Sequence, residues 1–163
     1  MVSVRRALLA LCVALFLLAC TGCQPNDQPG DKFLAQLPRE RQQLLAVATP
    51  EQVVAIYLGA VNEDEYDLAL ACLAKEAFQG SNTPDRYRAS FEGIESITDI
   101  AFEPPGTGGA QQGDDTRTWV VVSFTQHARP GADVMDGPLM RFVELRRSDP
   151  QGRWRIVALN SSP

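Results

Sequence analysis

Few residues of this chain have the chemistry to hold a metal or a cofactor, and their spacing does not gather them. The chain has a single histidine, His127, whereas a zinc or non-haem iron site usually uses a cluster of histidines and cysteines. Loop carboxylates occur at Asp114 with Asp115 and at Asp133 with Asp136, but without the alternating oxygen-ligand spacing of a calcium loop. No phosphate-binding loop or hydrolase motif is present. We therefore predict no metal and no cofactor, with His127 at a surface or rim.

Cys20 directly follows an apolar run over residues 7–19, and this run is preceded by a basic N-terminal segment. This run is shorter than the roughly 20 residues of a membrane-spanning helix. Leu17-Leu18-Ala19-Cys20 resembles the lipobox of bacterial lipoproteins, in which the cysteine is diacylated and becomes the new N-terminus. The resemblance implies a lipoprotein signal peptide over residues 1–19 and a covalent lipid, such as palmitate, that anchors the chain to the cell membrane, facing outside the cytoplasm. Cys23 is the alternative lipidation residue, and a cleaved signal with incidental cysteines is the remaining reading.

The charge and length of the chain limit its possible partners and the number of its domains. The net formal charge is −5, and loss of residues 1–19 with their two arginines would bring it to about −7. An acidic chain of this kind is not expected to bind nucleic acid. We predict a tether and a loose helix over residues 20–48 and a single domain over residues 49–163. Cys72 is expected to be a small buried residue, with a disulfide to Cys23 as the alternative.

Three helices are predicted in the first half of this domain. Thr49-Pro50-Glu51-Gln52 has the residues of a capping box, and apolar residues then recur at helical spacing as far as Val61. A second helix is predicted over residues 66–78, and Thr83-Pro84 begins a short third helix that runs through Phe91.

Strands follow the helices. Alternating patterns predict strands from Glu95, over residues 116–127, over residues 139–147 and over residues 153–160. In the longest strand, Val120, Val122 and Phe124 share one face, and His127 belongs to the other. Helices followed by consecutive strands with short turns predict an α+β domain, in which the N-terminal helices cover a curved antiparallel sheet of about four strands.

Five arginines lie on the last two predicted strands: Arg141, Arg146, Arg147, Arg153 and Arg155. Neighbouring strands can bring them together as an anion-binding patch. Glu144 and Asp149 would partly neutralise such a patch, so we predict a solvated outer face of the sheet.

Tyr57-Leu58-Gly59-Ala60-Val61-Asn62, followed by an acidic turn and Tyr66-Asp67, resembles the first helical hairpin of the nuclear-transport-factor-2-like superfamily. This is the cone-shaped, cystatin-like fold of ketosteroid isomerases and SnoaL-type cyclases. Trp154-Arg155-Ile156-Val157 and the final Ser162-Pro163 are similar to small bacterial lipoproteins of unknown function with that fold. The resemblance implies a pocket, which we expect to be lined by Tyr57, Tyr87, Phe91, Val122 and Phe124.

The same resemblance bears on catalysis. Tyr57 falls where the isomerases keep an oxyanion-donating tyrosine, but their catalytic aspartate falls on Ser81, which cannot act as a base near neutral pH. A shifted match reaches Asp85 at the farthest. We therefore expect no catalytic residues and a binding or accessory lipoprotein whose partner is a small hydrophobic ligand or an envelope protein. The alternative is an isomerase- or cyclase-like enzyme that acts on a small hydrophobic molecule.

Overall fold

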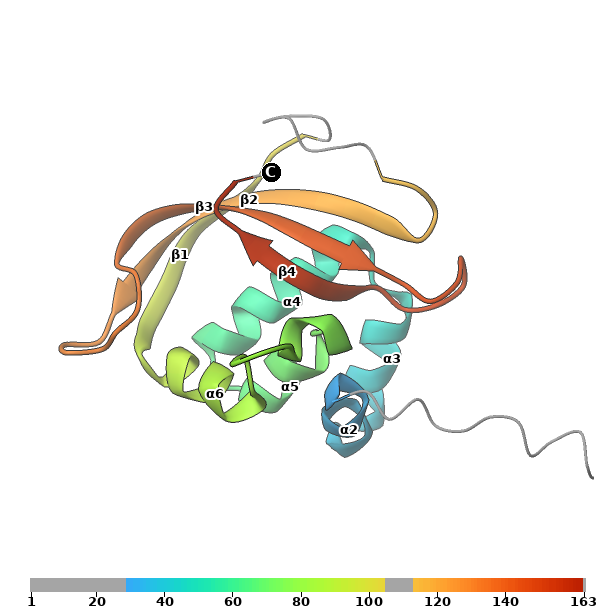
Figure 1. Cartoon of the computed structure of the whole chain (residues 1–163), viewed down its shortest axis with the longest axis horizontal. Coiled ribbons are helices and arrows are strands. Elements are labelled where there is room, and N and C mark those ends of the chain that lie inside the picture. Colours follow the sequence, from blue (N-terminus) through green and yellow to red (C-terminus); the bar gives the residue numbers. More distant parts are fainter. Residues whose placement is uncertain (1–28, 105–112, 163) are drawn as a thin grey trace, which may run out of the picture.

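The computed structural model describes residues 29–104 and 113–162. These residues form an α+β structure in which helices precede a four-stranded antiparallel sheet, so the predicted fold class is confirmed at this level. Figure 1 shows the sheet curving over the helices, with α4 lying directly beneath it. The predicted signal segment and its cysteines, Cys20 and Cys23, lie outside the described residues.

The sheet is a simple meander, as the short predicted turns require. Its strands are β1 (Ile94–Phe102), β2 (Arg117–Ala128), β3 (Gly137–Arg146) and β4 (Arg155–Asn160), which neighbour one another in chain order. Each pair of neighbours is antiparallel. The inner face of β2 and β3 is apolar and buried, with side chains exposed by 6% or less: Val120, Val122, Phe124, Val143 and Leu145. This face forms the core with the helices.

The predicted first helix of the domain is α4 (Pro50–Asn62). Its capping box is formed, because the Gln52 N–H donates to Thr49 Oγ1 at 3.3 Å and the Thr49 N–H donates to Gln52 Oε1 at 2.8 Å. These bonds satisfy N–H groups that a helix start leaves without partners. The other predicted cap also holds, since Thr83 Oγ1 accepts from Arg86 N at 3.2 Å at the start of α6 (Pro84–Glu92).

The predicted helix over residues 66–78 is wrong in extent. It divides into α5 (Tyr66–Ala71) and a 3-10 helix, η1 (Lys75–Phe78). Between them the chain forms a parallel bridge with β4 at Leu73 and Ile156, with Ala74 N donating to Ile156 O at 2.8 Å. Pairing with a distant strand replaces helical hydrogen bonds here, and an apolar periodicity in the helix does not reveal that exchange.

The predicted domain boundary at residue 49 is too late. Residues 29–47 form α2 (Pro29–Gln36) and α3 (Arg39–Val47), separated by Leu37 and Pro38. Leu45 is 1% exposed and belongs to the core. Asp31 of α2 accepts from Arg153 at 2.7 Å and from Arg155 at 2.9 Å, which joins this segment to the far end of the chain.

Strand β1 changes direction at Asp99. The φ angle of Asp99 is 54°, in the left-handed region, and the register of β1 against β2 shifts around it. Ile97 lies opposite Gln126 and Phe102 lies opposite Val122, so the extra residue of the bulge brings Phe102 to the same face as Ile97. Ile100 and Phe102 are nevertheless 40% and 37% exposed, whereas Ile97 is 6% exposed.

Candidate ligand-binding cavity

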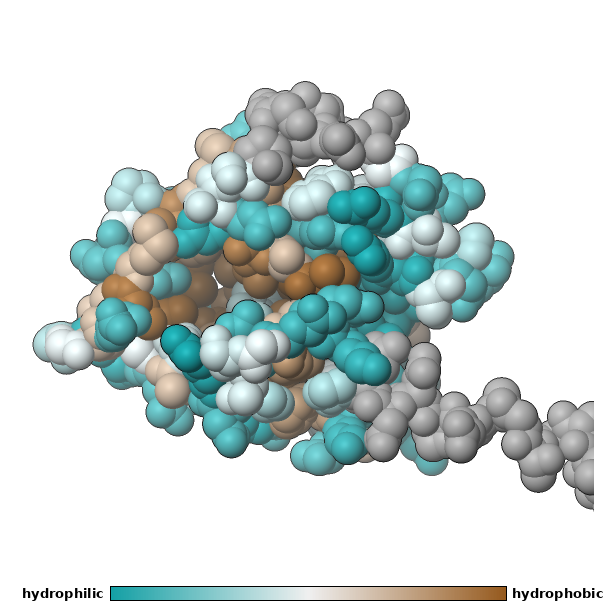
Figure 2. Space-filling model, in the orientation of Figure 1, coloured by the Kyte–Doolittle hydropathy of each residue, from teal (hydrophilic) through white to brown (hydrophobic). Residues whose placement is uncertain are grey.

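A cavity of about 570 Å³ lies between the helices and the inner face of the sheet. Figure 2 shows a hollow on this side of the molecule, with hydrophobic residues inside it and hydrophilic residues around it. Helices α4 and α6, η1, all four strands and the β2–β3 connection contribute to its wall. Its size falls within the range of small-molecule sites, about 300–1,000 Å³.

Aromatic rings make one wall of the cavity. The Phe91 ring is 3% exposed and lies between Tyr57, at a centroid distance of 6.0 Å, and Tyr87, at 5.9 Å. Phe78 adds an edge-on contact to Tyr87 at 5.7 Å. The Tyr87 hydroxyl donates to the Ala77 carbonyl oxygen at 3.2 Å, which fixes this ring in place. This wall is therefore mainly aromatic, and its rings are positioned by contacts with one another and by the Tyr87 hydrogen bond.

Four of the five residues predicted to line the pocket do so. Tyr57, Tyr87, Phe91 and Phe124 line the cavity. Val122 does not, because its side chain is fully buried in the core. Strand parity alone places Val122 and Phe124 on the same face, but it does not tell which of them the helices cover.

Tyr57 presents a hydroxyl group without a fixed partner. It lines the cavity, and among the residues that the structure describes its hydroxyl makes no hydrogen bond. Burial raises the pKa of Tyr57, and the neighbouring Tyr87 and Cys72 raise it further. The phenol therefore stays protonated near neutral pH and can donate to an oxygen acceptor.

Several polar residues that were not predicted from the sequence also line the cavity. Glu76 of η1, Asp133 of the β2–β3 connection and Arg141 of β3 bring charges to the wall, and the amides there belong to Asn82, Gln126 and Asn160. Ser81 and Asp85, where the resemblance places a catalytic base, are exposed and are not on this wall. Glu76 was missed because it belongs to the segment predicted as a continuous helix.

The predicted grouping of five arginines on the outer face is wrong for Arg141, Arg153 and Arg155. Arg141 lines the cavity, since it lies opposite the fully buried Val122 in the register of β2 and β3. Arg153 and Arg155 instead pair with Asp31 of α2. Strand parity distinguishes Arg141 from Arg146, whereas a count of basic residues does not.

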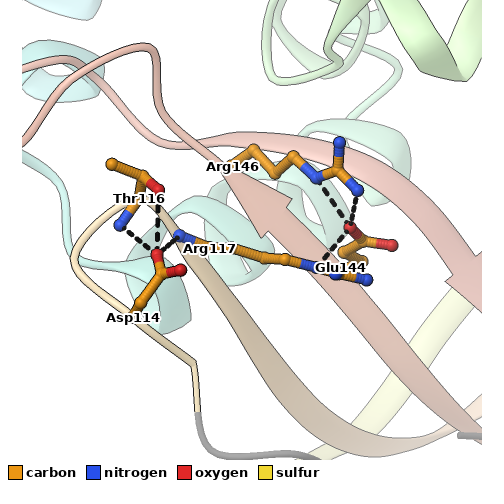
Figure 3. Close-up of polar contacts among 5 residues, drawn as sticks. All are labelled: Asp114, Thr116, Arg117, Glu144 and Arg146. Carbon is orange, nitrogen blue, oxygen red and sulfur yellow. Dashed lines mark hydrogen bonds and ion pairs between the residues drawn. The ribbon is translucent and has the colours of Figure 1, made fainter.

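On the outer face a different set of residues interacts. Glu144 is 8% exposed and lies between Arg117, at 2.9 Å, and Arg146, at 2.7 Å (Figure 3). The Arg117 guanidinium also lies 5.6 Å from the centre of the Trp119 ring. These contacts pair charges of opposite sign, which agrees with the predicted partial neutralisation of this face.

The remaining chemically capable residues lie apart. His127 is exposed at the end of β2, as predicted, and is not on the cavity wall. Cys72 is fully buried, its thiol donates to the Leu68 carbonyl oxygen at 3.3 Å, and burial raises its pKa to about 12. Among residues 29–104 and 113–162, no three histidine, cysteine, aspartate or glutamate side chains are grouped so that they could hold a metal ion.

Comparison with known proteins gives no matching family model, no similar curated protein and no similar solved structure. Of the helices that the structure describes, none has the length and apolar character needed to cross a bilayer.

Proposed function

We propose that this chain is a bacterial lipoprotein, anchored in the cell membrane and facing outside the cytoplasm, that binds a small hydrophobic ligand without catalysing a reaction. The aromatic-walled cavity of about 570 Å³ is the observation that carries the binding function. The lipobox-like Leu17-Leu18-Ala19-Cys20 supports the anchor. An accessory role toward an envelope protein would use the same anchored domain.

The proposal includes the fold family. A helical layer under a curved antiparallel meander supports the cone-shaped, nuclear-transport-factor-2-like architecture. The cavity lies between the two layers, where such a cone would be hollow, and Tyr57 contributes to its wall. In this proposal the helices and the sheet hold the walls apart, and the ligand fills the space between them.

The apolar dye N-phenylnaphthylamine tests the binding function. It is uncharged, its fluorescence rises in apolar surroundings, and its rings match the aromatic wall. We expect the full chain to bind it and Leu159→Trp, which fills the cavity from β4, to weaken binding about tenfold or more. Thr125→Trp is the matched control, because Thr125 lies on β2 outside the cavity. Equal affinity in both variants, or no binding by the full chain, would contradict the proposal.

A second candidate is an isomerase- or cyclase-like enzyme, which one observation favours. The free hydroxyl of Tyr57 shares a cavity with two carboxylates, Glu76 and Asp133, so a proton donor and candidate bases are both on the wall. An enzyme of this kind would accelerate deuterium exchange next to the carbonyl of a cyclic ketone in heavy water, followed by NMR. Tyr57→Phe would abolish that acceleration, whereas the binding function predicts no acceleration in any variant.

A further inference from the structure

We infer that the ligand of this cavity carries a single anionic group, such as a carboxylate or a sulfonate, on an apolar ring system, and that Arg141 binds the anion. This inference rests on the proposed binding function and adds the charge of the ligand to it.

Arg141 occupies an apolar position of the sheet. It lies opposite Val122 in the register of β2 and β3, and Leu139 and Val143 flank it on the same face of β3. Val122 and Val143 are both fully buried. Arg141 itself is partly exposed, so its guanidinium loses only part of its hydration at this wall and can gain hydrogen bonds from a bound partner.

The partners of Arg141 are weak. Its Nη1 donates to the Met140 carbonyl oxygen and its Nη2 to the Met135 sulfur, each at 3.1 Å. A thioether is a poor acceptor, and among the described residues no carboxylate lies within 4.0 Å of this guanidinium. Four other arginines of the sheet region have carboxylate partners: Arg117 and Arg146 share Glu144, and Arg153 and Arg155 share Asp31.

The carboxylates of Glu76 and Asp133 on the cavity wall bear on the charge that the ligand can carry. Burial and the Arg153 charge lower the pKa of Arg155, and the charges of Asp31 and Glu76 oppose that shift. Glu76 therefore lies close enough to Arg155 to act on it. Asp133 comes from the β2–β3 connection. Because both carboxylates share the cavity with Arg141, they disfavour additional negative charge on the ligand, so we expect a single anionic group, bound at Arg141.

The rest of the wall defines the body of the ligand. Three aromatic rings, those of Tyr57, Tyr87 and Phe91, face the cavity together with Phe124. Rings and fused rings make more contact with such a wall than a polar molecule would. A planar guanidinium also binds a carboxylate or sulfonate through two parallel hydrogen bonds. The ligand class is therefore an aromatic or alicyclic monoanion.

Two matched dyes test this inference on the full chain. Anilinonaphthalene sulfonate and N-phenylnaphthylamine share their ring system, and only the first carries an anionic group. We expect the sulfonate to bind about tenfold or more tightly than the neutral dye. Arg141→Met should remove this preference, so the affinity for the sulfonate should fall about tenfold relative to the affinity for the neutral dye. Arg141→Lys should retain part of it, because lysine keeps the charge but not the planar fork.

Arg39→Met is the control, because Arg39 is exposed on α3 and is not on the cavity wall. It loses the same charge, and dye bound elsewhere on the chain contributes equally to every variant. Equal affinity for the two dyes, an equal loss in Arg39→Met, or a parallel loss of both dyes in Arg141→Met would overturn the role of Arg141. If the role of Arg141 is overturned but the neutral dye still binds, and Leu159→Trp abolishes that binding, the proposed function stands. Failure to bind either dye would overturn both.

Discussion

Asp114 shows how one exposed carboxylate organises the start of a strand. Its Oδ1 accepts from the Thr116 N–H at 2.7 Å, from the Thr116 hydroxyl at 2.8 Å and from the Arg117 N–H at 2.8 Å (Figure 3). These bonds favour the charged form, so they lower the pKa of Asp114. The backbone of Arg117 is thereby fixed where its side chain reaches Glu144.

Asp114→Asn is expected to destabilise the protein in a pH-dependent way. A carboxyl group whose pKa is lowered on folding stabilises the folded state above its unfolded pKa, and this contribution disappears as the pH falls through the folded pKa. Urea unfolding at neutral pH should therefore show a lower midpoint for the variant than for the original chain, with the two midpoints converging below about pH 4. Asp115→Asn is the control. A difference that persists unchanged in acid would contradict the prediction.

Arg141 shows what residue-level reading of the sequence captures and what it loses. The sequence shows that Arg141 alternates in step with Leu139 and Val143. This parity alone predicts that Arg141 and Arg146 lie on opposite faces of the strand. The lack of a carboxylate partner for Arg141 could not be predicted from the sequence, because such partners come from segments distant in sequence. Asp31, for example, pairs with Arg153 across more than a hundred residues.

Among the elements, α2 depends on one close approach. A Cβ atom at Gly30 would lie 2.3 Å from the Leu73 carbonyl oxygen, which is shorter than any real contact of this kind. Gly30 is buried, and Leu73 belongs to the bridge with Ile156. Only glycine allows α2 to lie this near the backbone that joins α5 to η1.

Gly30→Ala is expected to lower the free energy of unfolding by about 1–3 kcal/mol, because backbone atoms must separate to admit the methyl group. Gly59→Ala is the matched control: a Cβ there meets nothing within 4 Å, and alanine favours the interior of α4 by up to about 1 kcal/mol. Chemical unfolding of both variants checks the pair. Equal stability of Gly30→Ala and the original chain would show that α2 is not docked as described.

Elements were predictable where their signals are local. The Thr49 and Thr83 caps predicted the starts of α4 and α6 correctly, because a cap is formed by residues three positions apart. The end of α5 was not predictable, since Leu73 leaves the helix to pair with Ile156. The role of α2 and α3 was also missed, because a Pro38-containing polar segment resembles a linker until its contacts with the core are known.

For the whole molecule, the predicted anchor has a chemical consequence that can be measured. If Cys20 is diacylated, the mature chain begins at that residue and carries the mass of its acyl chains. Mass spectrometry of the N-terminal peptide should find this modification, and Cys20→Ser should abolish it while Cys23→Ser leaves it intact. The reverse pattern would assign the lipid to Cys23. An unmodified N-terminus at Thr21 or later would overturn the anchor.

At this scale the sequence predicted the class of architecture and most of the aromatic wall. The order of helices and strands, with short turns, led to an antiparallel sheet covered by helices. The resemblance added the idea of a pocket, and four of its five expected residues line the cavity. The charges on the wall came from three separate elements, so only the tertiary structure brings Glu76, Asp133 and Arg141 to one cavity.

The ion pairs of Asp31 give the proposed tether a mechanical route into the domain. A pull from a membrane anchor on the N-terminal side would load α2 first. Asp31 would pass that load to Arg155, the first residue of β4, and to Arg153 just before it. The same strand supplies Val157 and Leu159 to the cavity. Tension between the membrane and the domain would therefore act on a wall of the binding site rather than on a distant linker.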